Sequence, residues 1–177
     1  MKKILTLLLV FAIFLVGCTM GKKKETPSEK VANYLDSYNK LDDNVLTDLD
    51  NLVDNMKDYN SNQQERYKKL MKRHYEDLKY EIKSENIEDD QAVVEVEIEV
   101  YDYSGIMNGS VMEEDFTDED GNYDMNKYND YQLDLLESVN NKVKYTILFN
   151  LTKQDNNWVL EEPNDTVIQK IHGIYAY

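Results

Sequence analysis

Hydrophobic side chains follow two different periods along this chain, and the change of period separates a helical part from a strand-rich part. They recur at helical spacing over residues 31–56 and again over 67–78. Thr26 to Glu29 form a capping box with proline at the first helical position, and Ser61 to Gln64 repeat the capping pattern. We predict helices that start at these two points, with a break near residues 42–44.

Beyond Lys79 the apolar side chains alternate with polar ones, which is typical of strands with one buried and one solvent-exposed face. The clearest case is the stretch 92–103, in which valine and isoleucine at even positions alternate with glutamate. Strands are expected at 79–88, 92–103, 142–152 and 158–162, with a helix near 128–139 between the two hairpins and a last helical turn capped by Asp165.

Charge indicates how these strands pair. A row of Glu95, Glu97 and Glu99 repels itself unless lysines lie opposite, and lysine pairs are available at 79/83 and 142/144. We therefore place strand 92–103 between strands 79–88 and 142–152, all antiparallel, with 158–162 outermost. The predicted fold class is α+β, with N-terminal helices packed on the apolar face of a curved, cone-like four-stranded antiparallel sheet and a helix inserted between the hairpins.

The start of the chain carries its most specific motif. Lys2 and Lys3 precede an apolar run over residues 4–16, which as a helix is roughly 20 Å long at ~1.5 Å per residue. A hydrocarbon core is about 30 Å thick, so the run fits a secretory signal better than a permanent span. Leu15-Val16-Gly17-Cys18 ends the run and resembles the lipobox of bacterial lipoprotein precursors.

That resemblance implies cleavage between Gly17 and Cys18 and a diacylglyceryl group on the Cys18 thiol. Two acyl chains on one residue anchor stably where one chain is marginal, so the expected location is the extracytoplasmic face of the cell membrane. Residues 1–17 are then the signal peptide, 18–25 a lipidated tether and 26–177 a single domain. The alternatives are an ordinary cleaved signal with a chance cysteine, or an uncleaved anchor.

Composition excludes several classes of function. The formal charge is −15, and it becomes −17 when a leader with Lys2 and Lys3 is removed, which argues against a nucleic-acid partner. Nearly all charged residues from 85 to 137 are acidic; this is typical of a solvated surface, and the sharper alternative is a patch for a cation or a basic partner. Cys18 is the only cysteine, so a disulfide within the domain and a cysteine nucleophile are excluded.

The order of predicted elements resembles the nuclear-transport-factor-2-like, cystatin-like α+β cone. More narrowly, the chain is similar to small lipoproteins of unknown function from low-GC Gram-positive bacteria. The residues behind this similarity are T-P-S-E-K-V at 26–31, V-E-V-E-I-E-V-Y-D-Y at 94–103, and the tail from Trp158 to Gly173. These motifs are structural, so the resemblance implies a fold and carries no activity.

An acidic loop around Gly121 invites a calcium interpretation, because oxygen ligands at alternate positions around a glycine turn suit Ca²⁺. With Gly121 as the sixth residue of a calcium loop, however, positions one and twelve are Phe116 and Lys127, where Asp and Glu are needed. We therefore expect no metal in loop 113–124, with a weak, irregular site as the alternative. Since no phosphate-cradling glycine loop, H-E-x-x-H or serine-nucleophile motif occurs, we expect no cofactor.

Three residues are candidates for proton transfer. Asp102 follows Val100 on the apolar face of its strand; it is either a buried carboxylate or the point at which the strand emerges into water. His74 lies on a helix face, where a partly buried histidine with satisfied hydrogen bonds is expected. His172 ends the last helix, where the helix dipole favours a protonated imidazole.

Two functions from different classes follow from these observations. The first is a non-catalytic binding module of the cell envelope, whose ligand is a protein or a small molecule, with no catalytic residue. The second is a cone-type enzyme that uses Asp102 or His172 for proton transfer in its cavity.

Overall fold

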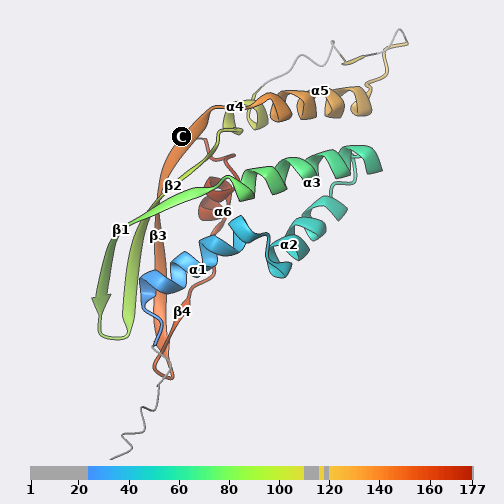
Figure 1. Cartoon of the computed structure of the whole chain (residues 1–177). Coiled ribbons are helices and arrows are strands. Elements are labelled where there is room, and N and C mark those ends of the chain that lie inside the picture. Colours follow the sequence, from blue (N-terminus) through green and yellow to red (C-terminus); the bar gives the residue numbers. More distant parts are fainter. Residues whose placement is uncertain (1–23, 110–115, 118–119, 177) are drawn as a thin grey trace, which may run out of the picture.

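A computed structural model describes residues 24–109, 116–117 and 120–176 of the chain. In chain order the elements are α1 (Pro27–Lys40), α2 (Asp43–Asp54), α3 (Ser61–Glu76), β1 (Lys79–Glu88), β2 (Gln91–Tyr101), α4 (Ser104–Met107), α5 (Met125–Ser138), β3 (Lys142–Gln154), β4 (Asn157–Leu160) and α6 (Asp165–Ile171). Figure 1 shows a sheet along one side of the molecule, with α1, α3 and α5 beside it. Within the described ranges, no helix has the length and apolar character of a membrane span.

The sheet has the predicted strand order, β1-β2-β3-β4, with antiparallel pairing throughout. The predicted charge rows meet in part: Glu99 lies opposite Lys79 on one side and Lys144 on the other, whereas Glu95 lies opposite Ser84 and Leu148. Glu97 accepts a hydrogen bond of 2.9 Å from Lys144 Nζ and lies 3.6 Å from Lys83 Nζ. The hydrogen bond from Lys144 is the main reason that the pKa of Glu97 lies below its ordinary value.

Helix starts depend on side-chain caps, and the structure confirms one predicted cap and corrects two. Thr26 and Glu29 form the expected capping box at the start of α1. The cap of α3 is Asn60, whose side chain pairs with the backbone of Gln63, so the predicted box at Ser61 was wrong by one residue. The cap of α6 is likewise Asn164 in place of Asp165, since the Asn164 side chain accepts from Val167 N.

Strand β2 ends at Tyr101, two residues earlier than predicted. The reason is a turn in which Ser104 donates from its backbone N and its hydroxyl to one carboxylate oxygen of Asp102, at 3.1 and 2.6 Å. This turn leads directly into the short helix α4, which the sequence pattern did not reveal.

Apolar side chains form two cores. The first lies between α1, α6 and the predicted apolar face of the sheet, and its centre is Val31, Leu35, Val94, Val96, Ile98, Val100, Tyr145, Ile147, Phe149 and Ile171. The second lies between α2, α3 and α5 and consists of Val45, Leu49, Val53, Tyr67, Leu70, Met71, Tyr75, Tyr103, Leu133, Leu136 and Val139. Tyr38 packs against both cores, so the end of α1 lies at their junction.

The two faces of β2 should respond oppositely to substitution. Ile98 is fully buried, and Ile98→Asp places an unpaired charge in the first core, which should reduce the free energy of unfolding by more than about 3 kcal/mol or prevent folding. Glu97→Gln, one residue away on the partly exposed face, should leave it nearly unchanged, because exposed ion pairs contribute little to stability. Urea unfolding followed by circular dichroism measures both, and the reverse ranking would refute the assignment of faces.

Candidate functional site

The last turn of α3 lies at the junction of the two cores, and side chains from distant elements fix it there. Asn39 of α1 donates from its amide to the carbonyl oxygens of Tyr75 and Leu78, at 2.9 and 2.8 Å. Lys142 of β3 pairs with the Asp77 carboxylate at 2.7 Å. The bond to Tyr75 O engages a carbonyl group that a helix end leaves without an intrahelical partner, and together these contacts fix the orientation of this turn.

His74, on this turn, is fully buried. Its Nε2 lies 2.7 Å from the carbonyl oxygen of Ile171, so Nε2 carries the proton and donates it, while Nδ1 has no hydrogen-bond partner among the described residues. Burial lowers the pKa of His74 to about 4. The histidine is therefore neutral at pH 7 and holds the end of α6 to α3. The prediction was a partly buried histidine with both nitrogens hydrogen-bonded; the structure buries it fully and leaves Nδ1 without a partner among the described residues.

The tail after α6 approaches His74 and β2 closely at Gly173. This glycine has φ of +70°, and a Cβ there would lie 2.0 Å from the carbonyl oxygen of Tyr101 and 3.0 Å from His74 Cε1. Gly173 in turn accepts a hydrogen bond of 2.8 Å from Tyr103 N. Glycine is required here because any side chain would clash with the backbone of β2.

His172 meets Tyr75 on the other side of the same turn. The Tyr75 hydroxyl and His172 Nε2 lie 3.1 Å apart, and their ring centroids are separated by 5.7 Å. Burial lowers the pKa of His172 to about 4. The expectation of a protonated imidazole favoured by the helix dipole was therefore wrong, because desolvation outweighs the dipole of a helix of only seven residues.

A pocket of about 120 Å³ opens beside His172. We call it the aromatic pocket; its lining residues are Tyr38, Val45, Asp48, Leu49, Leu52, Tyr75 and His172. They come from α1, α2, α3 and the C-cap of α6, so folding brings together residues that are far apart in the sequence. The pocket combines aromatic rings, an apolar helix face and one carboxylate.

Of the two alternatives for Asp102, the structure supports the end of the strand and not a buried carboxylate. Its carboxylate serves the turn to α4 by accepting from Ser104, and its backbone N donates to Asn141 O at 3.1 Å. The next residue, Tyr103, takes the buried place, and its ring lies 5.1 Å from that of His74. The structure therefore brings His74 and His172 to the same turn of α3 and assigns Asp102 a role in the backbone turn.

Two predicted sites fall wholly or partly outside the described residues. Gly17 and Cys18 lie there, so lipidation stays a prediction. In loop 113–124 the described residues are 116–117 and 120–124, of which Asp124 caps α5 through Lys127 N. No group of three or more His, Cys, Asp or Glu in the described part of the chain is arranged to hold a metal ion.

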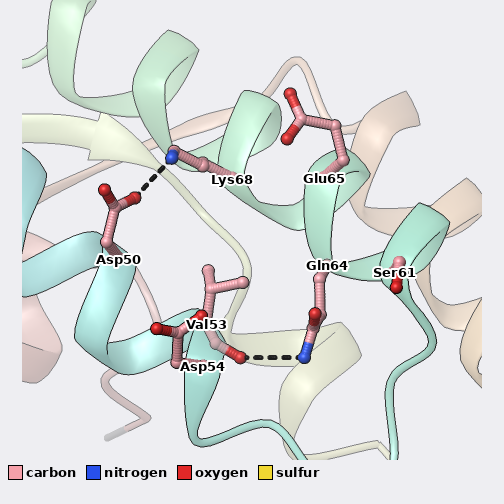
Figure 2. Close-up of a pocket in the computed structure, with 7 residues that line it drawn as sticks. All are labelled: Asp50, Val53, Asp54, Ser61, Gln64, Glu65 and Lys68. Carbon is pink, nitrogen blue, oxygen red and sulfur yellow. Dashed lines mark hydrogen bonds and ion pairs between the residues drawn. The ribbon is translucent and has the colours of Figure 1, made fainter.

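A groove of about 280 Å³ between α2 and α3 is lined mostly by polar side chains, with Val53 as the apolar one, as Figure 2 shows. The Asp50 carboxylate forms an ion pair with Lys68, and Gln64 Nε2 donates to the carbonyl oxygen of Val53 at 3.3 Å. Glu65 lies apart from the Asp50–Lys68 ion pair in this view. The carboxylates do not converge on one point, so this groove offers no centre for catalysis.

A further groove of about 510 Å³ lies beside α3, next to the end of α5, and carries four basic residues, of which two are already engaged. Arg66 pairs with Asp130, Asp134 and Glu137 of α5 at 3.4, 2.6 and 3.0 Å. Arg73 donates to the carbonyl oxygen of Val139 at 3.1 Å and lies over the ring of Tyr101. Both arginines therefore act mainly in joining α3 to α5 and β2.

Comparison of the chain with protein-family models, with curated proteins and with solved structures finds no match. The site must therefore be interpreted from its own chemistry.

Sequence reasoning missed the aromatic pocket, although one signal was available. On α2 the apolar face runs through Val45, Leu49 and Leu52, and Asp48 stands at a position of that same face.

The buried histidines make stability depend on pH in a defined window. Their pKa is lower in the folded chain than the ordinary 6.5, so the unfolded chain takes up protons first as pH falls. The free energy of unfolding should therefore decrease from about pH 6.5 towards pH 4. His74 alone accounts for roughly 3 kcal/mol, at ~1.4 kcal/mol per tenfold change in proton affinity. Urea unfolding at a series of pH values measures this.

A matched variant distinguishes the contribution of His74 to this pH dependence from the contribution of the carboxylates. Hydrogen bonding to Lys142 lowers the pKa of Asp77, and that stabilisation is lost only as pH falls below about 4. His74→Gln keeps an amide that can donate to Ile171 O and removes one of the two imidazoles behind the pH dependence, while His172 remains. Its stability should be flatter in this range than that of the wild type; an equally steep decrease would contradict the assignment.

Proposed function

We propose that this chain is a lipid-anchored protein of the extracytoplasmic face of the cell membrane, whose domain binds a protein or small-molecule ligand without catalysis. The observation behind the anchor is the complete match at Leu15-Val16-Gly17-Cys18, behind a basic and apolar leader. A diacylglyceryl group on Cys18 supplies the two acyl chains that stable anchoring needs. The tether of residues 18–25 reaches less than ~30 Å when extended, which keeps the domain near the bilayer.

We assign the domain to the nuclear-transport-factor-2-like, cystatin-like cone, within small lipoproteins of low-GC Gram-positive bacteria. The order of elements supports this: helices first, then a hairpin, an inserted helix and a second hairpin. The placement of α1 and α6 over the apolar face of the sheet also fits a cone. Because one fold carries many functions, this assignment adds nothing to the choice of activity.

Binding is favoured over catalysis by the state of the candidate groups. A general base must reach a substrate, and His74 is fully buried with its Nε2 committed to Ile171 O. The Asp102 carboxylate is committed to the turn at Ser104. The aromatic pocket, by contrast, presents a ready surface of rings and aliphatic side chains, which is typical of a ligand site.

One observation supports the alternative, a cone-type enzyme with a proton-transfer site. His172 lines the pocket, is neutral because burial lowers its pKa to about 4, and shares a hydrogen bond with the Tyr75 hydroxyl. A neutral imidazole oriented by a second group meets two requirements of a general base.

Lipidation is tested by metabolic labelling of cells with a radioactive fatty acid. The wild-type chain should be labelled and should sediment with membranes, whereas Cys18→Ser should be unlabelled because no thiol is available for the diacylglyceryl group. Ser28→Ala, a matched change within the folded domain, is the control and should be labelled like the wild type. Equal labelling of Cys18→Ser and wild type would refute the lipoprotein assignment.

Binding and catalysis are distinguished by the fate of the captured ligand. Crosslinking in intact cells identifies what the anchored chain contacts, and incubation of that compound with the purified chain shows whether its mass changes. An unchanged mass supports a binding module. A changed mass with the wild type that disappears with His172→Gln would establish the enzyme in its place.

A further inference from the structure

Aromatic rings form one wall of the aromatic pocket. Tyr38 and Tyr75 lie with their ring centroids 5.1 Å apart at an interplanar angle of 74°, and Tyr34 continues the cluster 5.5 Å from Tyr38. Each ring presents a face or an edge to its neighbours, and the hydroxyls of Tyr34 and Tyr38 lie 3.1 Å apart. These pairs are edge-to-face, and Tyr38 and Tyr75 are the two rings that line the pocket, where the π electrons of an aromatic ring attract a cation.

The charged lining of the pocket is negative only. Of the residues that line the pocket, Asp48 is the one that is charged at pH 7. Its carboxylate forms no ion pair or hydrogen bond with other described residues. Burial raises the pKa of Tyr75, and the nearby phenols and the negative charge of Asp48 add to the rise. His172 is neutral at pH 7 because burial lowers its pKa to about 4. The lining therefore attracts positive charge and contains no cation that would repel it.

We propose that the aromatic pocket is a binding site for a small organic cation, of the class that carries a quaternary ammonium group. The methyl groups of such a cation contact Tyr38 and Tyr75, and its charge lies near the Asp48 carboxylate. Val45, Leu49 and Leu52 of α2 supply the apolar contacts that a methylated ammonium tolerates and a hydrated metal ion does not. This inference rests on the proposed binding function and names its ligand class.

Size and charge are consistent with this class. A volume of about 120 Å³ suits a small group, and a trimethylammonium group has only four heavy atoms. The net charge of −15 raises the concentration of cations near the surface and speeds their association. A larger ligand would bind through its ammonium group in the pocket and leave its remainder in solvent.

The test uses the full chain in a non-ionic sugar detergent, labelled with fluorotyrosine and titrated with choline. Its matched neutral probe is 3,3-dimethylbutan-1-ol, in which carbon replaces the charged nitrogen and the shape is kept. Choline should shift the ¹⁹F NMR signals of Tyr38 and Tyr75, assigned from Tyr→Phe variants. The neutral probe should bind at least about tenfold more weakly, because it lacks the attraction of the charge to the rings and to Asp48.

Two variants of α2 identify the carboxylate responsible. Asp48→Asn should weaken choline binding about tenfold, whereas Asp54→Asn, which lines the groove of Figure 2, should leave it unchanged. Three results would each overturn the inference: no response of Tyr38 and Tyr75, equal binding of the neutral probe, or unaltered binding by Asp48→Asn. A chain that captures a partner in cells and shows no choline response would refute this inference and leave the proposed binding function intact.

Discussion

The close approach of the C-terminal tail to the end of β2 is the contact on which the rest of this structure depends. Gly173 lies so near the Tyr101 carbonyl that a single added carbon would be 2.0 Å from it. The neighbouring Ile171 accepts from His74 and fills the first core, while Tyr103 donates to Gly173. The tail thereby joins the sheet core to the core between α2, α3 and α5.

The same contact builds the candidate site. Once Ile171 and Gly173 are fixed, His172 between them must lie against Tyr75, and the aromatic pocket closes between α1, α2 and α3. His74 belongs to the last turn of α3, and His172, almost a hundred positions later in the sequence, packs against the same turn. Desolvation lowers the pKa of both, so both imidazoles are neutral at pH 7.

Local rules were sufficient to predict much of the fold. Alternation identified the buried face of β2, and the charge row at Glu95, Glu97 and Glu99 predicted the neighbours of that strand, because a two-residue period and cross-strand charge are visible in the sequence. Cap positions were less secure, since Asn60 and Asn164 compete with adjacent polar residues for the same role. The aromatic pocket was missed because four elements contribute to it, and sequence spacing does not report their tertiary arrangement.

The unfolding free energy of Gly173→Ala, compared with that of Gly105→Ala, tests most directly whether the tail contact holds the two cores together. Gly105 lies in α4 with no atom within 4 Å of an added Cβ, so alanine there should change stability by less than ~1 kcal/mol. Gly173→Ala combines a positive φ with a backbone clash and should lose at least ~2 kcal/mol. Equal stabilities of the two variants would contradict this account.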